Sequence, residues 1–262
     1  MSWNPSLLPR GRGAVRLEVS QGLATLVFDN PEARNAMSVG MMADMVAIVD
    51  RLEASDVLAV LMYGVGGAGF CAGGDLRDVR SHLLTPETAK GMPQVMGDAL
   101  DRLSQLPAVV VAAVEGAALG GGAELITVAD WVVASEGAKI GFVHARLGVT
   151  PGWGGGRRLV RRVGARTALS IMLEAKGYCG KEAHRVGLVD QVVSDGTAEA
   201  RARDWIDPIL QHPKESIRGV LEIIRQAHVG DDLDRNTERD VFAKLWGGEA
   251  HIHALGGVKA GG

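Results

Sequence analysis

One stretch, residues 106–131 (LPAVVVAAVEGAALGGGAELITVADW), constrains the fold of this chain more than any other. Pro107 ends the preceding segment, and Ala108–Val114 is an unbroken apolar run with recurring β-branched residues, which predicts a strand buried on both faces. The consecutive glycines Gly120–Gly122 then precede a helical segment that reaches Ala129. Glycines at a helix start are costly unless the backbone must come close to something. The pattern therefore predicts a strand–loop–helix unit in which the backbone of the loop lies close to another group.

The same glycines leave N–H groups without partners at the positive end of a helix dipole, an arrangement suited to an oxyanion. Glu124 is the first polar side chain inside the predicted helix, one turn beyond the glycines. The alternative interpretation is tight packing of strand against helix, with Glu124 as a solvated side chain. The glycines alone do not decide between the two interpretations.

Composition limits the classes of protein to be considered. A chain of 262 residues can build one large domain, or a domain with an appendage. Its net charge of −3 argues against nucleic acid as a partner. Cys71 and Cys179 are too few for a disulfide framework, which favours a reducing compartment. The longest apolar run is far shorter than the ~20 residues that span a bilayer. We expect a soluble, cytoplasmic protein with no membrane partner and no secretory signal.

Apolar spacing predicts an alternation of strands and helices along the first two-thirds of the chain. Such an alternation implies right-handed crossovers and parallel strands, with ligands at the carboxyl ends of the strands. The glycine-rich stretch GVGGAGFCAGGDL is predicted to be a loop that leads into a helix, and a flexible linker is the alternative interpretation. The predicted elements are a hairpin of Val15–Val19 and Leu23–Phe28, a helix from the N-cap Ser38 to about Leu52, a strand Val57–Tyr63, a helix start at Asp75, a helix Pro86–Leu106, and short strands Trp131–Ala134 and Lys139–Gly141.

A basic cluster and the C-terminal third carry further predictions. Four arginines, at 157, 158, 161 and 162, are spaced for the exposed side of a helix. A solvated face or a subunit contact is the favoured interpretation, and contact with a substrate phosphate is the alternative. From Thr197 onward the pattern is helical, with a charged run at Asp231–Arg235. We expect this region to act as a lid or in assembly.

Three stretches together resemble the crotonase (enoyl-CoA hydratase/isomerase) superfamily: DNPEARNAMS, GFCAGGDL, and GAALGGGAEL followed by LGVTPGWGGGRRL. The resemblance implies an α/β fold, with a crotonase-like ββα spiral core and acyl-CoA site in residues 1–195. It also implies a C-terminal helical trimerisation region in residues 196–262, giving a homotrimer or a dimer of trimers. Members of the superfamily bind acyl-CoA thioesters and stabilise an enolate. The thioester is the substrate, and neither a metal nor an organic cofactor is expected.

The resemblance assigns roles residue by residue. The amides of Gly74 and Gly121 match the two backbone donors to the thioester oxygen, and Glu124 and His144 match the polar pair of the pocket. Contacts with substrate or CoA are implied for Arg34, Ala36, Ala72, Gly73, Asp75, Leu76, Gly120 and Trp153.

His144 departs from the hydratase pattern, because hydratases of the superfamily carry a second glutamate at this position. Adding water across a double bond needs paired acid and base groups, so the imidazole puts hydration in doubt. The runs KIGFVHARLGVTPGWGG and TERDVFAKLWGGEAH instead resemble members that decarboxylate 2-alkylmalonyl-CoA, such as ethylmalonyl-CoA or methylmalonyl-CoA. The first run bears on the acyl pocket, and the second bears more on ancestry.

In that interpretation, one of Glu124 and His144 orients the substrate carboxylate and the other lies in the proton path, in an order that the residues leave open. An ionised Glu124 would repel the carboxylate, so we expect it to be protonated or turned away. The alternatives are another crotonase reaction (hydration, isomerisation or thioester hydrolysis) and a non-catalytic acyl-CoA binder.

Overall fold

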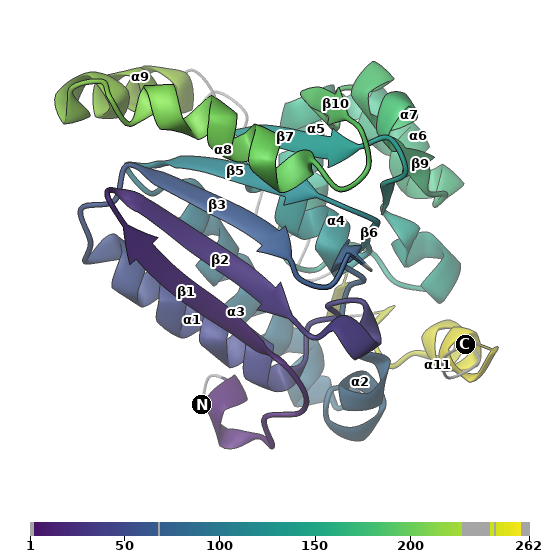
Figure 1. The fold of residues 1–262 in the computed structure, drawn as a ribbon. Helices are drawn as coiled ribbons and strands as arrows, with labels where there is room; N and C mark the ends of the chain where they lie inside the picture. Colours follow the sequence, from purple (N-terminus) through teal and green to yellow (C-terminus); the bar gives the residue numbers. More distant parts are fainter. Residues whose placement is uncertain (1–2, 68, 227–241, 244, 258–262) are drawn as a thin grey trace.

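A computed structural model describes the chain except for residues 1–2, 68, 227–241, 244 and 258–262, and its strands form two sheets (Figure 1). The larger sheet contains, in spatial order, β1 (Ala14–Ser20), β2 (Leu23–Asp29), β3 (Ala59–Gly64), β5 (Val109–Val114), β7 (Trp131–Ser135) and β10 (Gln191–Val193). The smaller sheet contains β4 (Gly69–Cys71), β6 (Ala117–Leu119), β8 (Lys139–Gly141) and β9 (Tyr178–Cys179). The β1–β2 and β8–β9 pairs are antiparallel, and the other described pairs are parallel.

The two sheets are linked strand by strand. In turn, β3 leads into β4, β5 into β6, and β7 into β8, and helical segments return the chain to the larger sheet each time. This arrangement is the ββα spiral that the superfamily resemblance implies, so the predicted fold class is confirmed. Since β4, β6 and β8 are parallel neighbours, the loops that follow them meet at one edge of the small sheet.

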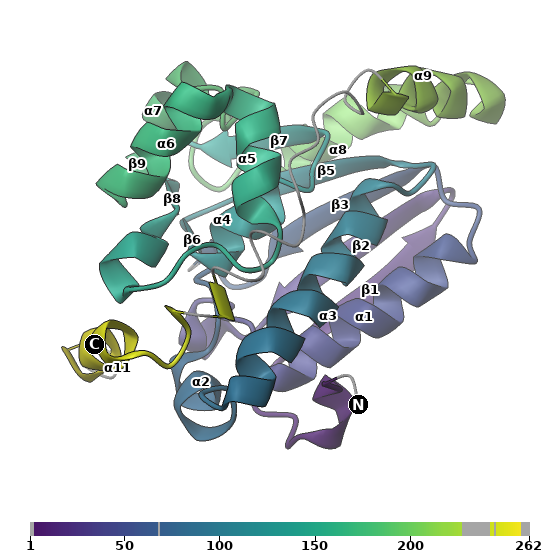
Figure 2. The same ribbon diagram turned by 180° about the vertical axis from the view of Figure 1, so that it is seen from behind.

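Helices cover both faces of the larger sheet. Figure 2 shows α1 and α3 side by side on one face, and α8 lies on the other face against β3, β5 and β7. The helical elements are η1 (Pro5–Leu7), η2 (Pro31–Ala33), α1 (Val39–Glu53), α2 (Leu76–His82), α3 (Pro86–Ser104), α4 (Gly121–Ile126), η3 (Val143–Leu147), α5 (Gly155–Val163), α6 (Ala165–Glu174), α7 (Gly180–Arg185), α8 (Ala198–Ile209), α9 (Lys214–Gln226) and α11 (Glu249–Gly257).

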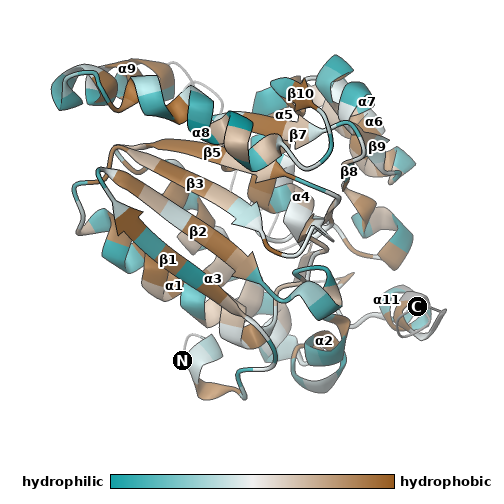
Figure 3. Cartoon of the chain, in the orientation of Figure 1, coloured by the Kyte–Doolittle hydropathy of each residue, from teal (hydrophilic) through white to brown (hydrophobic). Residues whose placement is uncertain are grey.

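Strand β5 shows why the central apolar run folds as it does. Val110, Ala112 and Val114 belong to the core on the α1–α3 side, whereas Val109 and Val111 belong to the core beneath α8. Side chains alternate between the faces of a strand, so a strand covered on both faces must be apolar throughout. The apolar colouring of β3 and β5 in Figure 3 follows from the same burial.

Most of the predicted elements are confirmed. The hairpin is β1–β2, and the Ser38 hydroxyl caps α1 by accepting a hydrogen bond from the Met41 amide. Asp75 caps α2 in the same way through the Arg77 amide. The loop before Asp75 contains β4, so its linker interpretation is wrong. The helix after the three glycines ends at Ile126, three residues earlier than predicted, and the short strand β6 was not predicted.

The C-terminal region divides into parts. Helix α8 buries Ala198, Ala202 and Ile206 in the core shared with the larger sheet, so it covers the sheet and is no separate appendage. The predicted domain boundary near residue 196 stays a prediction. The charged run Asp231–Arg235 lies outside the described residues. Among the helices that the structure describes, none has the length and apolar character needed to cross a bilayer.

Candidate active site

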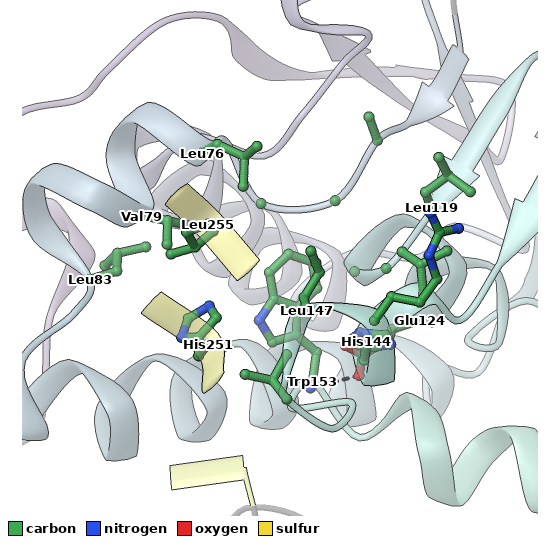
Figure 4. A pocket seen from close by; sticks show the side chains of 18 of the residues that line it. Leu76, Val79, Leu83, Leu119, Glu124, His144, Leu147, Trp153, His251 and Leu255 are labelled. Atoms are coloured by element: carbon green, nitrogen blue, oxygen red, sulfur yellow. Dashed lines mark hydrogen bonds and ion pairs between the residues drawn. The ribbon is translucent and has the colours of Figure 1, made fainter. Parts of the chain in front are cut away.

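A cavity of about 590 Å³ lies where the small sheet gives way to its loops (Figure 4). Its walls come from the loops before α2 and α4, from α2 itself, from η3 and the loop before α5, and from a C-terminal segment that ends in α11. Segments that are far apart in the sequence therefore meet around one space. The predicted residues Gly74, Gly121, Glu124 and His144 all line it.

Two amides in this cavity are available to a ligand. Met37 bonds to the residues on either side of Gly74, donating to the Gly73 carbonyl and accepting from the Asp75 amide, and this pattern bypasses the Gly74 N–H. Gly121 is the first residue of α4, where an N–H has no partner within the helix. In the described part of the chain, neither amide donates a hydrogen bond. Two donors in one cavity can bind a single carbonyl oxygen that gains negative charge.

The loops that carry these amides are in close contact. A Cβ atom on Gly73 would lie 3.4 Å from the Gly121 nitrogen. A Cβ on Gly121 would lie 2.3 Å from the Trp153 ring, and one on Gly122 would lie 1.8 Å from the Cys71 carbonyl oxygen. The tight-packing interpretation of the glycines is therefore correct as well. Close packing of the loops and binding of a ligand by an amide both require that no side chain cover the backbone. Burial raises the pKa of the Cys71 thiol to about 12, so this cysteine stays protonated and serves in packing.

Glu124 is buried and fully engaged by the protein. Its Oε2 accepts hydrogen bonds from the amides of Trp153 (2.7 Å) and Gly155 (3.0 Å), and its Oε1 accepts from the Gly152 amide (3.3 Å) and faces His144 Nε2 (3.1 Å). Burial opposes ionisation, but the hydrogen bonds from His144 and Gly155 outweigh it and lower the pKa of Glu124. The interpretation of Glu124 as a solvated side chain is wrong. Of the two expected states, protonated or turned away, the structure shows the second. Glu124 is ionised, with both oxygens turned to the protein.

His144 is held by this carboxylate. An ionised carboxylate can only accept, so Nε2 carries the proton of the shared hydrogen bond. The other ring nitrogen, Nδ1, is buried and has no hydrogen-bond partner in the described part of the chain. The sequence placed His144 and Glu124 in one pocket as a polar pair, and the structure brings them into contact.

The comparisons identify the family. The family model for enoyl-CoA hydratase/isomerase matches residues 18–247. The chain belongs to this enoyl-CoA hydratase/isomerase family. It is 39% identical over 254 residues to the ethylmalonyl-CoA decarboxylase of Danio rerio, covering 93% of this chain and 83% of that protein. It is 35% identical over 251 residues to the ethylmalonyl-CoA decarboxylase of Rattus norvegicus, with the same coverage of each chain. The superfamily resemblance read from the sequence is confirmed.

Solved structures agree. An enoyl-CoA hydratase/isomerase family protein from Hyphomonas neptunium is 33% identical and superposes with a TM-score of 0.78 over 90% of each chain. An enoyl-CoA hydratase/isomerase from Mycobacterium paratuberculosis has a TM-score of 0.83 at 20% identity, over 93% of this chain and 98% of that chain, which shows the shared fold.

Not every residue assigned from the family resemblance reaches the cavity. Arg34, Ala72, Gly73, Leu76, Gly120 and Trp153 line it. Asp75 and Ala36 are not among the described lining residues: the Asp75 side chain caps α2, and the Ala36 carbonyl accepts from the buried Asn30 amide. Trp153 is buried, with its indole N–H 2.9 Å from Met92 Sδ and its ring against Gly121, so it both packs and lines the pocket.

The arginines of α5 have a structural role that the sequence did not reveal. Arg157 and Arg158 both bind the buried carboxylate of Asp101 on α3, and Arg158 also donates to the Trp153 carbonyl oxygen and to Thr127. Arg162 bonds to the Leu188 and Ala129 carbonyls and pairs with Asp190. None of the four arginines is exposed. The prediction of a solvated face is therefore wrong, and none of the four arginines lines the described cavity. The alternative of a subunit contact stays a prediction.

Sequence reasoning missed other groups around the cavity. Lys139 and Arg146 line it beside Arg34, and all three are exposed cations without an ion pair in the described part of the chain. Phe242, Trp246, His251 and Leu255 also line it. Phe242, Trp246 and His251 belong to the run TERDVFAKLWGGEAH, which bears on the site as well as on ancestry. Their distance along the chain from the other lining residues hid this contact. Among the described residues, no cluster of three or more His, Cys, Asp or Glu side chains can hold a metal ion.

Proposed function

We propose that this protein decarboxylates a 2-alkylmalonyl-CoA to the corresponding acyl-CoA. Ethylmalonyl-CoA is the main substrate, and methylmalonyl-CoA, with its shorter alkyl group, is a second one. The observation that carries the proposal is one cavity holding two available amides, Gly74 and Gly121, beside a histidine that an ionised glutamate holds. The similarity to curated ethylmalonyl-CoA decarboxylases over 93% of the chain supports the same conclusion.

Two amides suit this reaction because of where charge develops. When the bond between Cα and the carboxyl carbon breaks, its electron pair moves into a thioester enolate, and the thioester oxygen becomes an oxyanion. Donors that are already in place stabilise this charge without reorganising. Removing one such donor costs about 3 kcal/mol, which is a hundredfold or more in rate. Gly74 and Gly121 are assigned this role.

The enolate then needs a proton at Cα, and His144 is assigned to supply it. Nε2 is occupied by the hydrogen bond to Glu124, which leaves Nδ1 as the nitrogen that gives up a proton. Because Nε2 keeps its own proton in the bond to Glu124, the proton that Nδ1 gives to Cα comes from the solvent. Glu124 therefore positions His144 and does not touch the substrate carboxylate. Water returns the proton to His144 after turnover, so the products are CO2 and the acyl-CoA.

The CoA part of the substrate carries phosphates, and the exposed cations beside the cavity match that charge. Arg34, Lys139 and Arg146 supply three positive charges from three different segments. Exposed cations give affinity and orientation to phosphates more than they give catalysis. We assign them to the nucleotide end of the substrate.

Enoyl-CoA hydration is the second candidate, because the family match carries that name and Glu124 lines the cavity. Hydration needs an acid and a base that can both reach the water and the substrate. Both oxygens of Glu124 are bound by protein groups, which weighs against this candidate. A non-catalytic acyl-CoA binder would have no use for a held imidazole next to two available amides.

The direct experiment offers the purified protein ethylmalonyl-CoA, methylmalonyl-CoA and crotonyl-CoA in separate reactions. We expect butyryl-CoA and CO2 from the first, slower formation of propionyl-CoA and CO2 from the second, and little hydroxybutyryl-CoA from the third. Rapid hydration of crotonyl-CoA with no release of CO2 from either malonyl thioester would contradict the proposal. A lack of turnover with all three would favour the binder.

A further inference from the structure

The end of the cavity that lies between α2 and the C-terminal segment is apolar, with one exception. Val79 of α2 and Leu83, the residue just after this helix, line this end together with Trp246 and Leu255. His251, on α11, is the polar side chain among them (Figure 4). The residue is 2% exposed, so its ring is enclosed by protein and by the cavity.

The His251 ring is fixed in position and in tautomer. The Gly247 amide donates to Nδ1 over 2.8 Å, so Nδ1 is the acceptor and the ring proton is on Nε2. The ring lies on Trp246, with 4.6 Å between the centroids. Trp246 in turn stacks on Phe242 and donates its indole N–H to the Leu83 carbonyl oxygen. A short chain of aromatic contacts therefore presents Nε2–H in one direction.

The Nε2–H group has no acceptor in any part of the chain that the structure describes, while the ring lines the cavity. A donor that faces a cavity and has no acceptor in the protein is open to a ligand or to water. The acceptor that fits must be a polar group that enters this mostly apolar part of the cavity together with the substrate. In a 2-alkylmalonyl thioester, the group that meets this description is the free carboxylate.

Glu124 and His144 cannot take that role. Glu124 is ionised with both oxygens engaged, and His144 Nε2 is used in holding it. Figure 4 shows His251 on the other side of the pocket from this pair, with Trp153 and Leu147 between them. The two histidines still belong to one site, because α11 packs against η3, which carries His144.

We infer that His251 binds and orients the substrate carboxylate through Nε2–H and so selects carboxylated acyl-CoA over acyl-CoA; the inference rests on the proposed decarboxylation. A neutral donor suits this task. It sets the direction of the breaking bond, whereas a cation would stabilise the carboxylate and slow its loss. Burial lowers the pKa of His251, in keeping with a neutral ring.

The test separates carboxylate recognition from general damage to the site. His251→Leu removes the donor, His251→Gln keeps an N–H at the end of the side chain, and His253→Leu is the control on the exposed face of the same helix. Two quantities are measured for each variant: kcat/KM for ethylmalonyl-CoA, and Kd for butyryl-CoA, which lacks the carboxylate.

We expect His251→Leu to lower kcat/KM by about 10- to 100-fold, the usual effect of one hydrogen bond to a charged group, while Kd for butyryl-CoA stays at the wild-type value. His251→Gln should recover part of the loss, and His253→Leu should match wild type. Wild-type kcat/KM in His251→Leu, or an equal loss of butyryl-CoA binding, would overturn the inference.

Failure of the proposed function gives a different result. If the wild-type protein leaves ethylmalonyl-CoA intact, the decarboxylase proposal is wrong, and ethylmalonyl-CoA becomes a stable ligand whose Kd can be measured. A selective loss of its binding in His251→Leu would then still support carboxylate recognition. An equal Kd in wild type and variant would overturn that as well.

Discussion

At the scale of single residues, the environment of a group decides its chemistry more than its identity does. Glu124 and His144 were assigned from the sequence as one polar pair with interchangeable roles. The hydrogen bonds from His144 and from the Gly155 amide outweigh burial and lower the pKa of Glu124, so its carboxylate is ionised. In the proposed mechanism, His144 is the member of the pair that transfers the proton.

This account predicts how stability depends on the charge of Glu124. Its folded-state pKa is lowered, so its stabilising effect is present above the ordinary value of 4.5 and is lost as pH falls below it. In Glu124→Gln, an amide NH2 group would face backbone N–H donors. We expect a loss of about 2–4 kcal/mol in the free energy of unfolding at pH 7, shrinking at acid pH. Urea unfolding of both proteins at pH 7 and pH 4 measures this difference. A gap of constant size at both pH values would contradict the ionised state.

Gly74 offers a matched pair of variants for the amide donors. A Cβ on Gly74 would meet only the Val79 side chain, at 3.5 Å, so Gly74→Ala keeps the N–H with little crowding. Gly74→Pro removes the N–H. We expect kcat for ethylmalonyl-CoA to stay close to wild type in the alanine variant and to fall a hundredfold or more in the proline variant. Circular dichroism confirms folding of both, and equal turnover by the two folded variants would remove Gly74 from the mechanism.

At the scale of elements, local signals were predictable and long-range ones were not. The Gln21-Gly22 turn and the Ser38 cap act within a few residues, so the sequence showed the β1–β2 hairpin and the start of α1. Strand β6 has three residues and exists because β4 and β8 pair with it on either side. No pattern of three residues can report such partners.

The residues of the candidate site also divide into those that local sequence motifs predict and those that depend on long-range contacts. Gly74, Gly121, Glu124 and His144, which family motifs carry, line one cavity. The C-terminal wall with His251 was missed, since its contact with α2 depends on how the chain folds back. The arginines of α5 differ from the prediction for a related reason. Helical spacing predicts an exposed face, but Asp101 of α3 pairs with Arg157 and Arg158, and Asp190 pairs with Arg162.

The Asp101 cluster should therefore matter for stability as well as for the site. Asp101 is buried between Arg157 and Arg158, and Arg158 also holds the Trp153 carbonyl. Losing one partner of a buried ion pair leaves an uncompensated charge, so we expect Asp101→Asn to lower the free energy of unfolding by about 3–5 kcal/mol. Asp50→Asn, which affects an exposed pair with Arg102, should cost less than about 1 kcal/mol. Similar urea midpoints for the two variants would contradict the structural role of α5.

At the scale of the whole molecule, the family resemblance predicts a trimer or a dimer of trimers, and helix α9 offers a surface for it. Val220, Ile223 and Ile224 are 59%, 69% and 51% exposed in the single chain. Exposed apolar side chains gathered on one helix mark an interaction surface. We expect native mass spectrometry to find three or six chains of 27.5 kDa in one particle.

A substitution on that surface tests the assignment. Ile223→Asp should dissociate the particle, whereas Leu7→Asp, at an exposed leucine of η1, should leave it intact. A wild-type monomer at micromolar concentration, or an assembly indifferent to Ile223→Asp, would remove α9 from the interface.

The central claim is that the amides of Gly74 and Gly121 bind one thioester oxygen, and a crystal structure with bound butyryl-CoA tests it most directly. Butyryl-CoA is the expected product and lacks the carboxylate, so it survives in the crystal. The account predicts the thioester oxygen at about 2.7–3.1 Å from both amide nitrogens. A thioester oxygen that contacts neither nitrogen, in a cavity otherwise filled by the acyl chain, would contradict it.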